Sequence, residues 1–422
     1  MKIFKEALRK KHTYAEGEKT SAERTVRDII NNVRDGGDKA VLDYTEKFDG
    51  YRPPALRVDP DAVKKAYSLV ESETAQNLRF AADRIRNFAA RQHDAFKELR
   101  YEITPGVTLG HRLIPIKSCG CYVPAGRYPL PSSALMSIIP ARIAGVERVA
   151  AASPASKETG GIHPAVLVAM DIAGADEIYC MGGAQAIAAF AYGTPSLPPV
   201  DIIVGPGNRY VTEAKRQVAG TVGIDMLAGP SEAVIIADES ADPVWIAADA
   251  LSNCEHDSDA WSVLLLTGEK LAAEVTAAIE AELKRLATAE LARQTWADNG
   301  RIIVVDSLNE AVQLSDEIAP EHLQVMTEDS AAVAKKLRDF GSLFIGRYAP
   351  VPFGDYVSGP NHILPTSRSA RFSCGVNTLT FLKISSFQEI TPEGGKFLSP
   401  HCAYLAGMEG LHGHRRSAEL RG

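Results

Sequence analysis

The sequence lacks several features that mark specialised classes of protein. No apolar run reaches the roughly 18 residues needed to cross a bilayer, and residues 1–19 contain no apolar core of a secretory signal. No Lys/Arg cluster offsets the net charge of −7, which argues against a nucleic-acid partner. The six cysteines form no C-x-x-C pair, and a chain of this size does not need disulfides. These absences predict a reduced, cytoplasmic protein with no membrane and no nucleic-acid partner.

The composition is that of an ordinary globular protein, with 422 residues, 45% hydrophobic and 23% charged. After the Pro105–Gly106 turn, short β-branched runs alternate with Ala-rich stretches, which predicts right-handed βαβ crossovers and mostly parallel sheets. We therefore predict an α/β fold: two doubly wound, Rossmann-like parallel-sheet domains, one inserted in the other, plus helical N- and C-terminal extensions. The predicted domains are an N-terminal extension 1–20, a discontinuous first domain 21–115 with 236–378, a second domain 116–235, and a C-terminal dimerisation segment 379–422.

Two polar residues follow a predicted helix near the middle of the chain. Residues 243–251 place apolar side chains at helical spacing, so Asn253 and His256, three residues apart, are expected on one helix face. An amide oxygen and an imidazole presented together would form half of an N/O site for a divalent metal such as zinc. The alternative is a helix cap or a satisfied polar pair.

Glu321 and His322 are adjacent in the segment Ala-Pro-Glu-His. A carboxylate and an imidazole side by side can divide acid and base duties, because burial raises a carboxyl pKa and a neighbouring carboxylate raises that of histidine. The alternative is the start of a helix, with Pro at its first position and Glu in its first turn.

Further ionisable residues lie toward the C-terminus. Asp355 and His362 fall in a long loop, 347–372, and are predicted to face a cleft, although a loop Asp is also common in Asx turns. Glu409 and His414 belong to a helical stretch that has no partner of its own. We expect that stretch to pack on another subunit.

Two glycine-rich turns, 182–185 and 205–208, each lie between a predicted strand and a predicted helix. Such turns can aim helix N-terminal amides at an anion, as in nucleotide sites. Neither turn has the G-x-G-x-x-G pattern, and glycine-rich turns are also the ordinary connections of these folds.

Ten short segments in this order resemble the histidinol dehydrogenase family over nearly the whole chain. They are GCYVP (120–124), GGAQA (182–186), VGPGN (204–208), EAKR (213–216), AGPSE (228–232), EH (255–256), APEH (319–322), GDY (354–356), NHILPT (361–366) and EGL (409–411). The resemblance implies a homodimer with exchanged C-terminal segments and one zinc ion per subunit. It also implies two NAD-dependent oxidations, from a primary alcohol through a bound aldehyde to a carboxylate.

The resemblance also implies residue roles. Carried over residue by residue, the zinc ligands, which also meet the substrate, are Asn253, His256, Asp355 and, from the other subunit, His414. Glu321 would activate the water that attacks the aldehyde, and His322 would take protons. The other implied substrate contacts are Ser231, His362 and Glu409. The residues implied to line the NAD pocket, in domain 116–235, are Tyr122, Gln185 and Asn208.

Two departures from the family pattern bear on the substrate. Asn253 stands where the family has Gln, so the side chain is shorter by one methylene, roughly 1.3–1.5 Å against a metal-bond tolerance of roughly 0.2 Å. The loop 125–130 adds Arg127, as in paralogues that oxidise 2,3-dihydroxypropane-1-sulfonate, and would suit an anionic substrate group. The expected reaction is L-histidinol to L-histidine. The alternatives are the sulfonated diol to sulfolactate and a non-catalytic binding paralogue.

Overall fold

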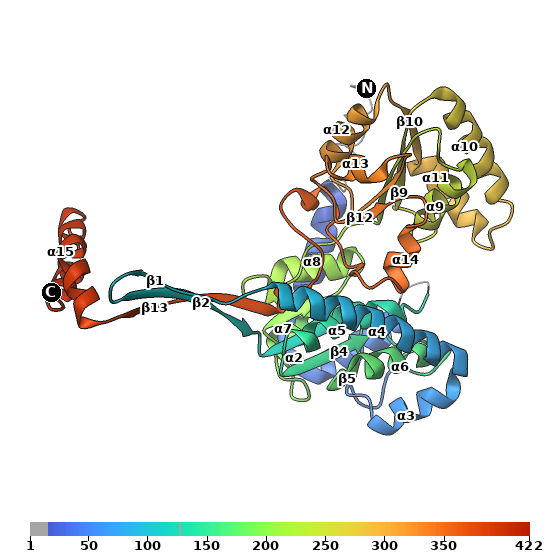
Figure 1. Ribbon diagram of the computed structural model, residues 1–422. Helices are drawn as coiled ribbons and strands as arrows, with labels where there is room; N and C mark the ends of the chain where they lie inside the picture. Colours follow the sequence, from blue (N-terminus) through green and yellow to red (C-terminus); the bar gives the residue numbers. More distant parts are fainter. Residues whose placement is uncertain (1–15, 126–127) are drawn as a thin grey trace.

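The computed structural model describes residues 16–125 and 128–422. It comprises two parallel sheets covered by helices and an antiparallel arm that projects from them (Figure 1). The predicted α/β fold with two parallel-sheet domains is therefore confirmed. In the part of the chain described, no helix is both long and apolar enough to cross a membrane.

The first sheet has the strand order β5-β4-β3-β6-β7, and all its pairs are parallel. Its strands are β3 (Ser118–Tyr122), β4 (Arg148–Ser153), β5 (Glu177–Cys180), β6 (Ile202–Val204) and β7 (Gly223–Ile224). Its helices are α5 (Pro131–Ile143), α6 (Pro164–Ala173), α7 (Gly183–Tyr192) and α8 (Arg209–Val218). The chain reverses direction across the sheet between β3 and β6. A crevice for a ligand is expected at the carboxyl ends of those two strands.

The second sheet repeats this topology with the order β10-β9-β8-β11-β12. Its strands are β8 (Glu232–Ala237), β9 (Trp261–Leu266), β10 (Arg301–Val304), β11 (His322–Met326) and β12 (Ser342–Ile345). Its helices are α9 (Pro243–Cys254), α10 (Glu269–Glu282), α11 (Ala289–Asn299), α12 (Leu308–Ile318), α13 (Ser330–Ala334) and α14 (Val351–Tyr356). Every residue of β8, β9 and β11 is buried, which agrees with their continuous apolar runs.

The N-terminal helices cover the first sheet. They are α2 (Glu16–Asp49), α3 (Pro60–Leu69) and α4 (Ser72–Ala95), of which α2 packs on α7 and α8, and α4 packs on α5 and α6. The sequence prediction instead grouped residues 21–115 with 236–378. Ile363, Val376 and Phe381 also join the core of the first sheet. The segments before and after the second sheet therefore both pack on the first sheet. The second sheet, 232–345, is the inserted part.

Gly37 bends helix α2. Glycine favours the end of a helix, but this helical segment continues to Asp49 after a kink at Gly37, where φ is 55° and ψ is −140°. This backbone conformation is open to glycine at little cost, so the glycine bends the helical segment instead of ending it.

The arm is a three-stranded antiparallel ribbon that ends in two helices. Its strands, in the order β1-β2-β13, are β1 (Leu99–Thr104), β2 (Val107–Pro115) and β13 (Leu382–Ile390). The helices are α15 (Pro392–Met408) and α16 (His412–Glu419), and short 3-10 turns occur at η1 (Ser369–Arg371) and η2 (Thr378–Phe381). Helix α15 and the C-terminus lie at the far end of the arm, away from both sheets (Figure 1).

Candidate active site

A cluster of buried ionisable side chains lies at the amino ends of two neighbouring strands in the second sheet. Glu232 begins β8, His322 begins β11, and Glu321 directly precedes β11. Their exposed fractions are 1%, 5% and 7%, respectively. The alternative interpretation of Glu321 as part of a helix start is wrong. Helix α12 ends at Ala319, in a left-handed conformation, and the chain then enters β11.

The backbone of Glu232 holds both Glu321 and His322. The Glu232 N–H donates to Glu321 Oε2 at 3.0 Å, and His322 Nδ1–H donates to the Glu232 carbonyl oxygen at 3.1 Å. Because Nδ1 carries a proton in this arrangement, Nε2 is the nitrogen that can exchange protons with a substrate. Nε2 is buried, lies 3.7 Å from Asp355 Oδ1, and has no hydrogen-bond partner among the described residues.

Burial and mutual attraction set the protonation of this pair. Burial raises the pKa of Glu321 to about 7. For His322, burial opposes the charged form, but the nearby carboxylates of Glu321 and Asp355 outweigh it and raise the pKa to about 9. Perturbed acid and base groups in one buried place are what proton transfer near neutral pH requires.

Asp355 and His362 lie beside the pair. Asp355 belongs to the short helix α14, not to a loop as predicted. Burial opposes its ionisation, but the nearby imidazole of His322, 3.7 Å away, holds the pKa of Asp355 below its usual range. His362 Nδ1–H donates to the Asp355 carbonyl oxygen at 3.0 Å. The Ser133 hydroxyl, in the first turn of α5, lies 3.4 Å from His362 Nε2. This contact links a helix of the first sheet to the cluster.

The end of α9 delivers Asn253 and His256. The helix ends at Cys254, so His256 lies beyond it and the predicted shared helix face is wrong. The Asn253 amide nitrogen donates to the Trp261 carbonyl (2.8 Å) and to Ser262 Oγ (3.2 Å), which fixes the amide and leaves Oδ1 as the atom for a metal. Burial lowers the pKa of His256, and the charge of Asp355 acts in the opposite direction. His256 is therefore within electrostatic reach of the cluster.

One chain offers an incomplete set of metal donors. Within residues 16–125 and 128–422, no group of three or more His, Cys, Asp or Glu side chains is arranged to hold a metal ion. The candidate donors His256, Asp355 and the oxygen of Asn253 are of the N/O type that zinc accepts. His256 and Asp355 interact electrostatically, and Asn253 lies at the end of α9, three residues before His256. His414 in α16 and Glu409 directly after α15 are exposed and lie on the arm. The structure of one chain does not bring them to the cluster.

The residues expected to meet NAD lie at the carboxyl edge of the first sheet. The Tyr122 hydroxyl accepts the Gly183 N–H at 3.2 Å. Gln185 is 1% exposed, and neither of its amide atoms has a hydrogen-bond partner in the described part of the chain. Asn208 caps α8 by accepting two backbone N–H groups of the first turn. A buried amide without partners beside this crevice fits a site completed by a polar ligand.

A buried ion pair, Lys215 with Asp225, fixes the turn that follows β6. Gly205 N donates to Asp225 Oδ2 at 2.8 Å, and Lys215 Nζ donates to the Gly205 carbonyl at 3.0 Å. At Gly205, φ is 130° and a Cβ would stand 2.0 Å from the Tyr122 carbonyl oxygen. Sequence reasoning missed Lys215, Asp225, Ser133 and Glu232. Lys215 could have been noticed because it lies on the same helix face as the apolar residues Val211, Ala214 and Val218.

The remaining predicted substrate residues are Ser231 and Arg127. Ser231 directly precedes Glu232, and its carbonyl oxygen accepts the Trp261 N–H at 3.1 Å. Arg127 lies outside the described residues.

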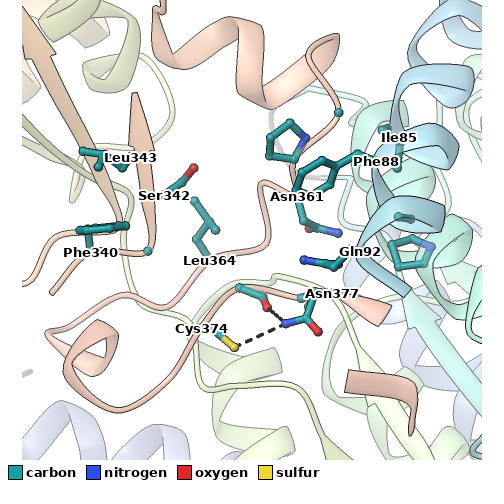
Figure 2. A pocket seen from close by; sticks show the side chains of 17 residues that line it. Ile85, Phe88, Gln92, Phe340, Ser342, Leu343, Asn361, Leu364, Cys374 and Asn377 are labelled. Atoms are coloured by element: carbon teal, nitrogen blue, oxygen red, sulfur yellow. Dashed lines mark hydrogen bonds between the residues drawn. The ribbon is translucent and has the colours of Figure 1, made fainter. Parts of the chain in front are cut away.

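A cavity of about 370 Å³ adjoins the cluster on the side of α4 and β12 (Figure 2). Asn361, next to His362, lines it, and its amide donates to the Met136 carbonyl at 2.6 Å. The amide of Asn377 donates to Cys374 Sγ (3.4 Å) and to the Gly375 carbonyl (2.9 Å) (Figure 2). Glu321, His322 and Asp355 are not among the described residues that line it, so the acid and base groups lie outside this cavity.

Known proteins similar to this chain are histidinol dehydrogenases. The family model described as histidinol dehydrogenase matches residues 12–422. Histidinol dehydrogenase of Agrobacterium fabrum is 48% identical over 399 residues, which cover 94% of this chain and 91% of that protein. The enzyme of Bacillus cereus strain ATCC 14579 is 44% identical over 423 residues, 99% of this chain and 97% of that protein.

A solved structure agrees with these relatives. The crystal structure of histidinol dehydrogenase from Elizabethkingia anophelis has a TM-score of 0.90 and 36% identity, and the match covers 94% of this chain and 91% of that one. The identities and the coverage exceed what a shared fold alone would require. This chain is an oxidoreductase that belongs to the histidinol dehydrogenase family.

Proposed function

We propose that this protein is a zinc- and NAD-dependent dehydrogenase that oxidises L-histidinol through a bound aldehyde to L-histidine. The observation that carries the proposal is the buried Glu321–His322 pair, with Asp355 Oδ1 3.7 Å from the imidazole. Membership of the histidinol dehydrogenase family supports the substrate. The retained acid and base groups argue against a non-catalytic binding paralogue.

In the first oxidation, the neutral form of His322 is the proton acceptor, and because the pKa of His322 is raised to about 9, the share of this form grows as pH rises toward that value. The alcohol carbon gives a hydride to NAD while its O–H proton passes to His322 Nε2, which is buried and within 3.7 Å of a carboxylate. The hydrogen bond from Nδ1 to the Glu232 carbonyl, 3.1 Å long, keeps the ring oriented for this transfer.

In the second oxidation, Glu321 takes a proton from the water that adds to the aldehyde. The aldehyde oxygen takes the proton that His322 gained in the first oxidation, which frees the imidazole and completes the hydrate. The hydrate would then give a hydride to a second NAD and an O–H proton to His322, and the carboxylic acid formed loses its remaining proton to solvent to give the carboxylate. The Glu321 carboxyl is held in place by the Glu232 N–H at 3.0 Å and is sheltered from bulk solvent. Burial therefore gives it the pKa of about 7 that a base working near neutral pH requires.

The proposal includes one zinc ion per subunit and an exchanged dimer. Asn253, His256 and Asp355 would hold the ion with His414 of the partner subunit, and bound zinc would fix the substrate and polarise its donor atoms. The position of the C-terminus at the end of the arm supports the exchange (Figure 1). So does the apolar surface of α15, where Tyr404 is 74% and Met408 is 68% exposed.

The test is NADH formation with L-histidinol, measured before and after chelation and zinc restoration. Two NADH per histidinol and loss of activity on chelation are expected. A parallel assay with 2,3-dihydroxypropane-1-sulfonate, repeated on Arg127→Ala, examines the alternative substrate. Turnover of the sulfonate alone would replace histidinol in the proposal, and no NADH with either alcohol in zinc-loaded protein would favour a binding paralogue.

A further inference from the structure

Glu232 is a buried carboxyl group to which neither the family resemblance nor the proposed reaction assigns a role. By strand alternation its side chain shares a face of β8 with Val234 and Ile236, which belong to an apolar core. One carboxyl oxygen, Oε1, accepts the Ser367 N–H at 2.8 Å, whereas Oε2 is buried without a hydrogen-bond partner among the described residues. This carboxyl therefore has half of the partners that a buried carboxylate would need.

The groups around Glu232 favour a negative charge on it less than burial opposes that charge. Burial is the largest influence and acts with the Glu321 carboxyl against ionisation, whereas His322 and the backbone of Ser367 and Glu321 act in its favour. The adjacent strand β11 contributes Glu321 and His322, and β9 contributes Trp261 in register with Glu232. The turn that contains Ser367 also carries Arg368. Its Nε is buried without a hydrogen-bond partner in the described part of the chain, so this atom does not donate to Glu232.

Glu321 is the better placed of the two carboxyls to ionise. It accepts the Glu232 N–H at 3.0 Å and lies 3.5 Å from His322 Nδ1. Two neighbouring carboxyls in a buried site do not both ionise readily, because each negative charge disfavours the other. The group with a donor and a cation beside it is ionised first.

We propose that Glu232 is a positioning residue that works as a neutral carboxylic acid: its backbone orients Glu321 and His322, and its retained proton leaves Glu321 as the carboxylate that activates water. With a proton on Oε2, Oε1 remains the acceptor for the Ser367 N–H. This inference rests on the proposed function for the role of Glu321. The direction of the pKa shifts agrees, because burial raises the pKa of Glu232 to about 8 and that of Glu321 to about 7.

The first test measures thermal unfolding of Glu232→Gln and of the native protein between about pH 5 and pH 9. A carboxyl whose pKa is raised on folding loses stabilising effect as pH rises from its unfolded value through its folded value. The Tm of Glu232→Gln relative to the native protein should therefore rise across this range. The exposed Glu239→Gln, in the segment after β8, should follow the native protein at every pH.

A Tm difference that does not change with pH, or that falls as pH rises, would overturn the proposal, because Glu232 would then be ionised in the folded protein. Glu232→Met, an apolar side chain of similar length, repeats the measurement if Glu232→Gln does not fold. This test needs no catalytic activity, so it separates failure of the inference from failure of the proposed function.

The second test compares the pH dependence of aldehyde oxidation in Glu232→Gln and the native protein. If Glu232 is neutral, the pH at which the rate falls to half should agree within about 0.3 unit, since no charge beside Glu321 is removed. A shift of this midpoint to lower pH by about one unit or more would mean that a negative charge had been removed, and would overturn the proposal.

Discussion

At the scale of single residues, burial and neighbouring charges shift the pKa values of Glu321 and His322 by different causes. Both are almost inaccessible to solvent, yet burial raises the pKa of the carboxyl to about 7, whereas neighbouring carboxylates outweigh burial for the imidazole and raise its pKa to about 9. The adjacency of the two side chains is visible in the sequence. Their common support, the backbone of Glu232, is not, because 89 and 90 positions separate it from them.

The two oxidation steps should respond differently to Glu321→Gln. Only the second step needs an activated water, so alcohol-to-aldehyde transfer should keep most of its rate and aldehyde oxidation should fall by roughly 10²–10⁴-fold, the usual contribution of a general base. Single-turnover NADH formation from histidinol and from histidinal separates the steps. Equal losses in both would contradict the assignment of Glu321 as the water-activating base.

The rate of aldehyde oxidation should also depend on pH through Glu321. Glu321 acts as a base only when ionised, and burial raises its pKa to about 7. The rate should therefore be highest above this pH and fall by about tenfold for each unit below it. A profile measured at saturating NAD and histidinal checks this. A rate that stays constant from pH 8 down to pH 5 would exclude Glu321 as the titrating base.

At the scale of helices and strands, the periodicity of apolar residues predicts the elements better than their ends and partners. It predicts a helix after Pro243, but not that α9 ends at Cys254 and leaves His256 beyond it. Periodicity also predicts which face of α4 is apolar. It does not predict that this face packs on α5 and α6 of the first sheet. Local patterns cannot contain that information, since the matching surfaces lie far apart in the chain.

The buried pair of Lys215 and Asp225 should be essential for the turn after β6. The side chains are 2% and 0% exposed, so Lys215→Met leaves an unpaired buried carboxylate and should cost about 3–5 kcal/mol in the free energy of unfolding. It should also raise the KM for NAD more than it lowers kcat, because Gly205 loses its support. Urea unfolding and NAD kinetics measure these effects.

A neighbouring ion pair provides the control for Lys215→Met. Arg216 pairs with Glu213 on the same helix, but its side chain is 50% exposed, so Arg216→Ala should cost at most about 1 kcal/mol. Restored stability in Lys215→Met combined with Asp225→Leu would attribute the loss to the unpaired charge. If Lys215→Met and Arg216→Ala unfold at the same urea concentration, the buried pair does not hold the turn.

At the scale of the whole molecule, the arm is the feature that one chain cannot explain. Its ribbon and terminal helices project away from both sheets (Figure 1). Large apolar side chains of α15 are exposed. The sequence contains the motif around Glu409. It does not show that the arm lies far from the cluster of the same chain, because that separation depends on the fold. In an exchanged dimer, a partner subunit would cover this apolar surface, and His414 of α16 would reach the metal site of the other subunit.

Hybrid dimers provide a direct test of this exchange. His256→Ala and His414→Ala should each be inactive, because every site of either homodimer lacks one proposed ligand. In a hybrid of the two, one site carries both substitutions and the other carries neither. Random mixing makes half of the dimers hybrids, so activity should recover to about a quarter of the native value. Coexpression of differently tagged chains gives this mixture, and the isolated doubly tagged dimer, in which one site of two is intact, should have about half of the native activity. If His414 served its own subunit, each site of the hybrid would still carry one substitution, and the isolated hybrid would remain inactive.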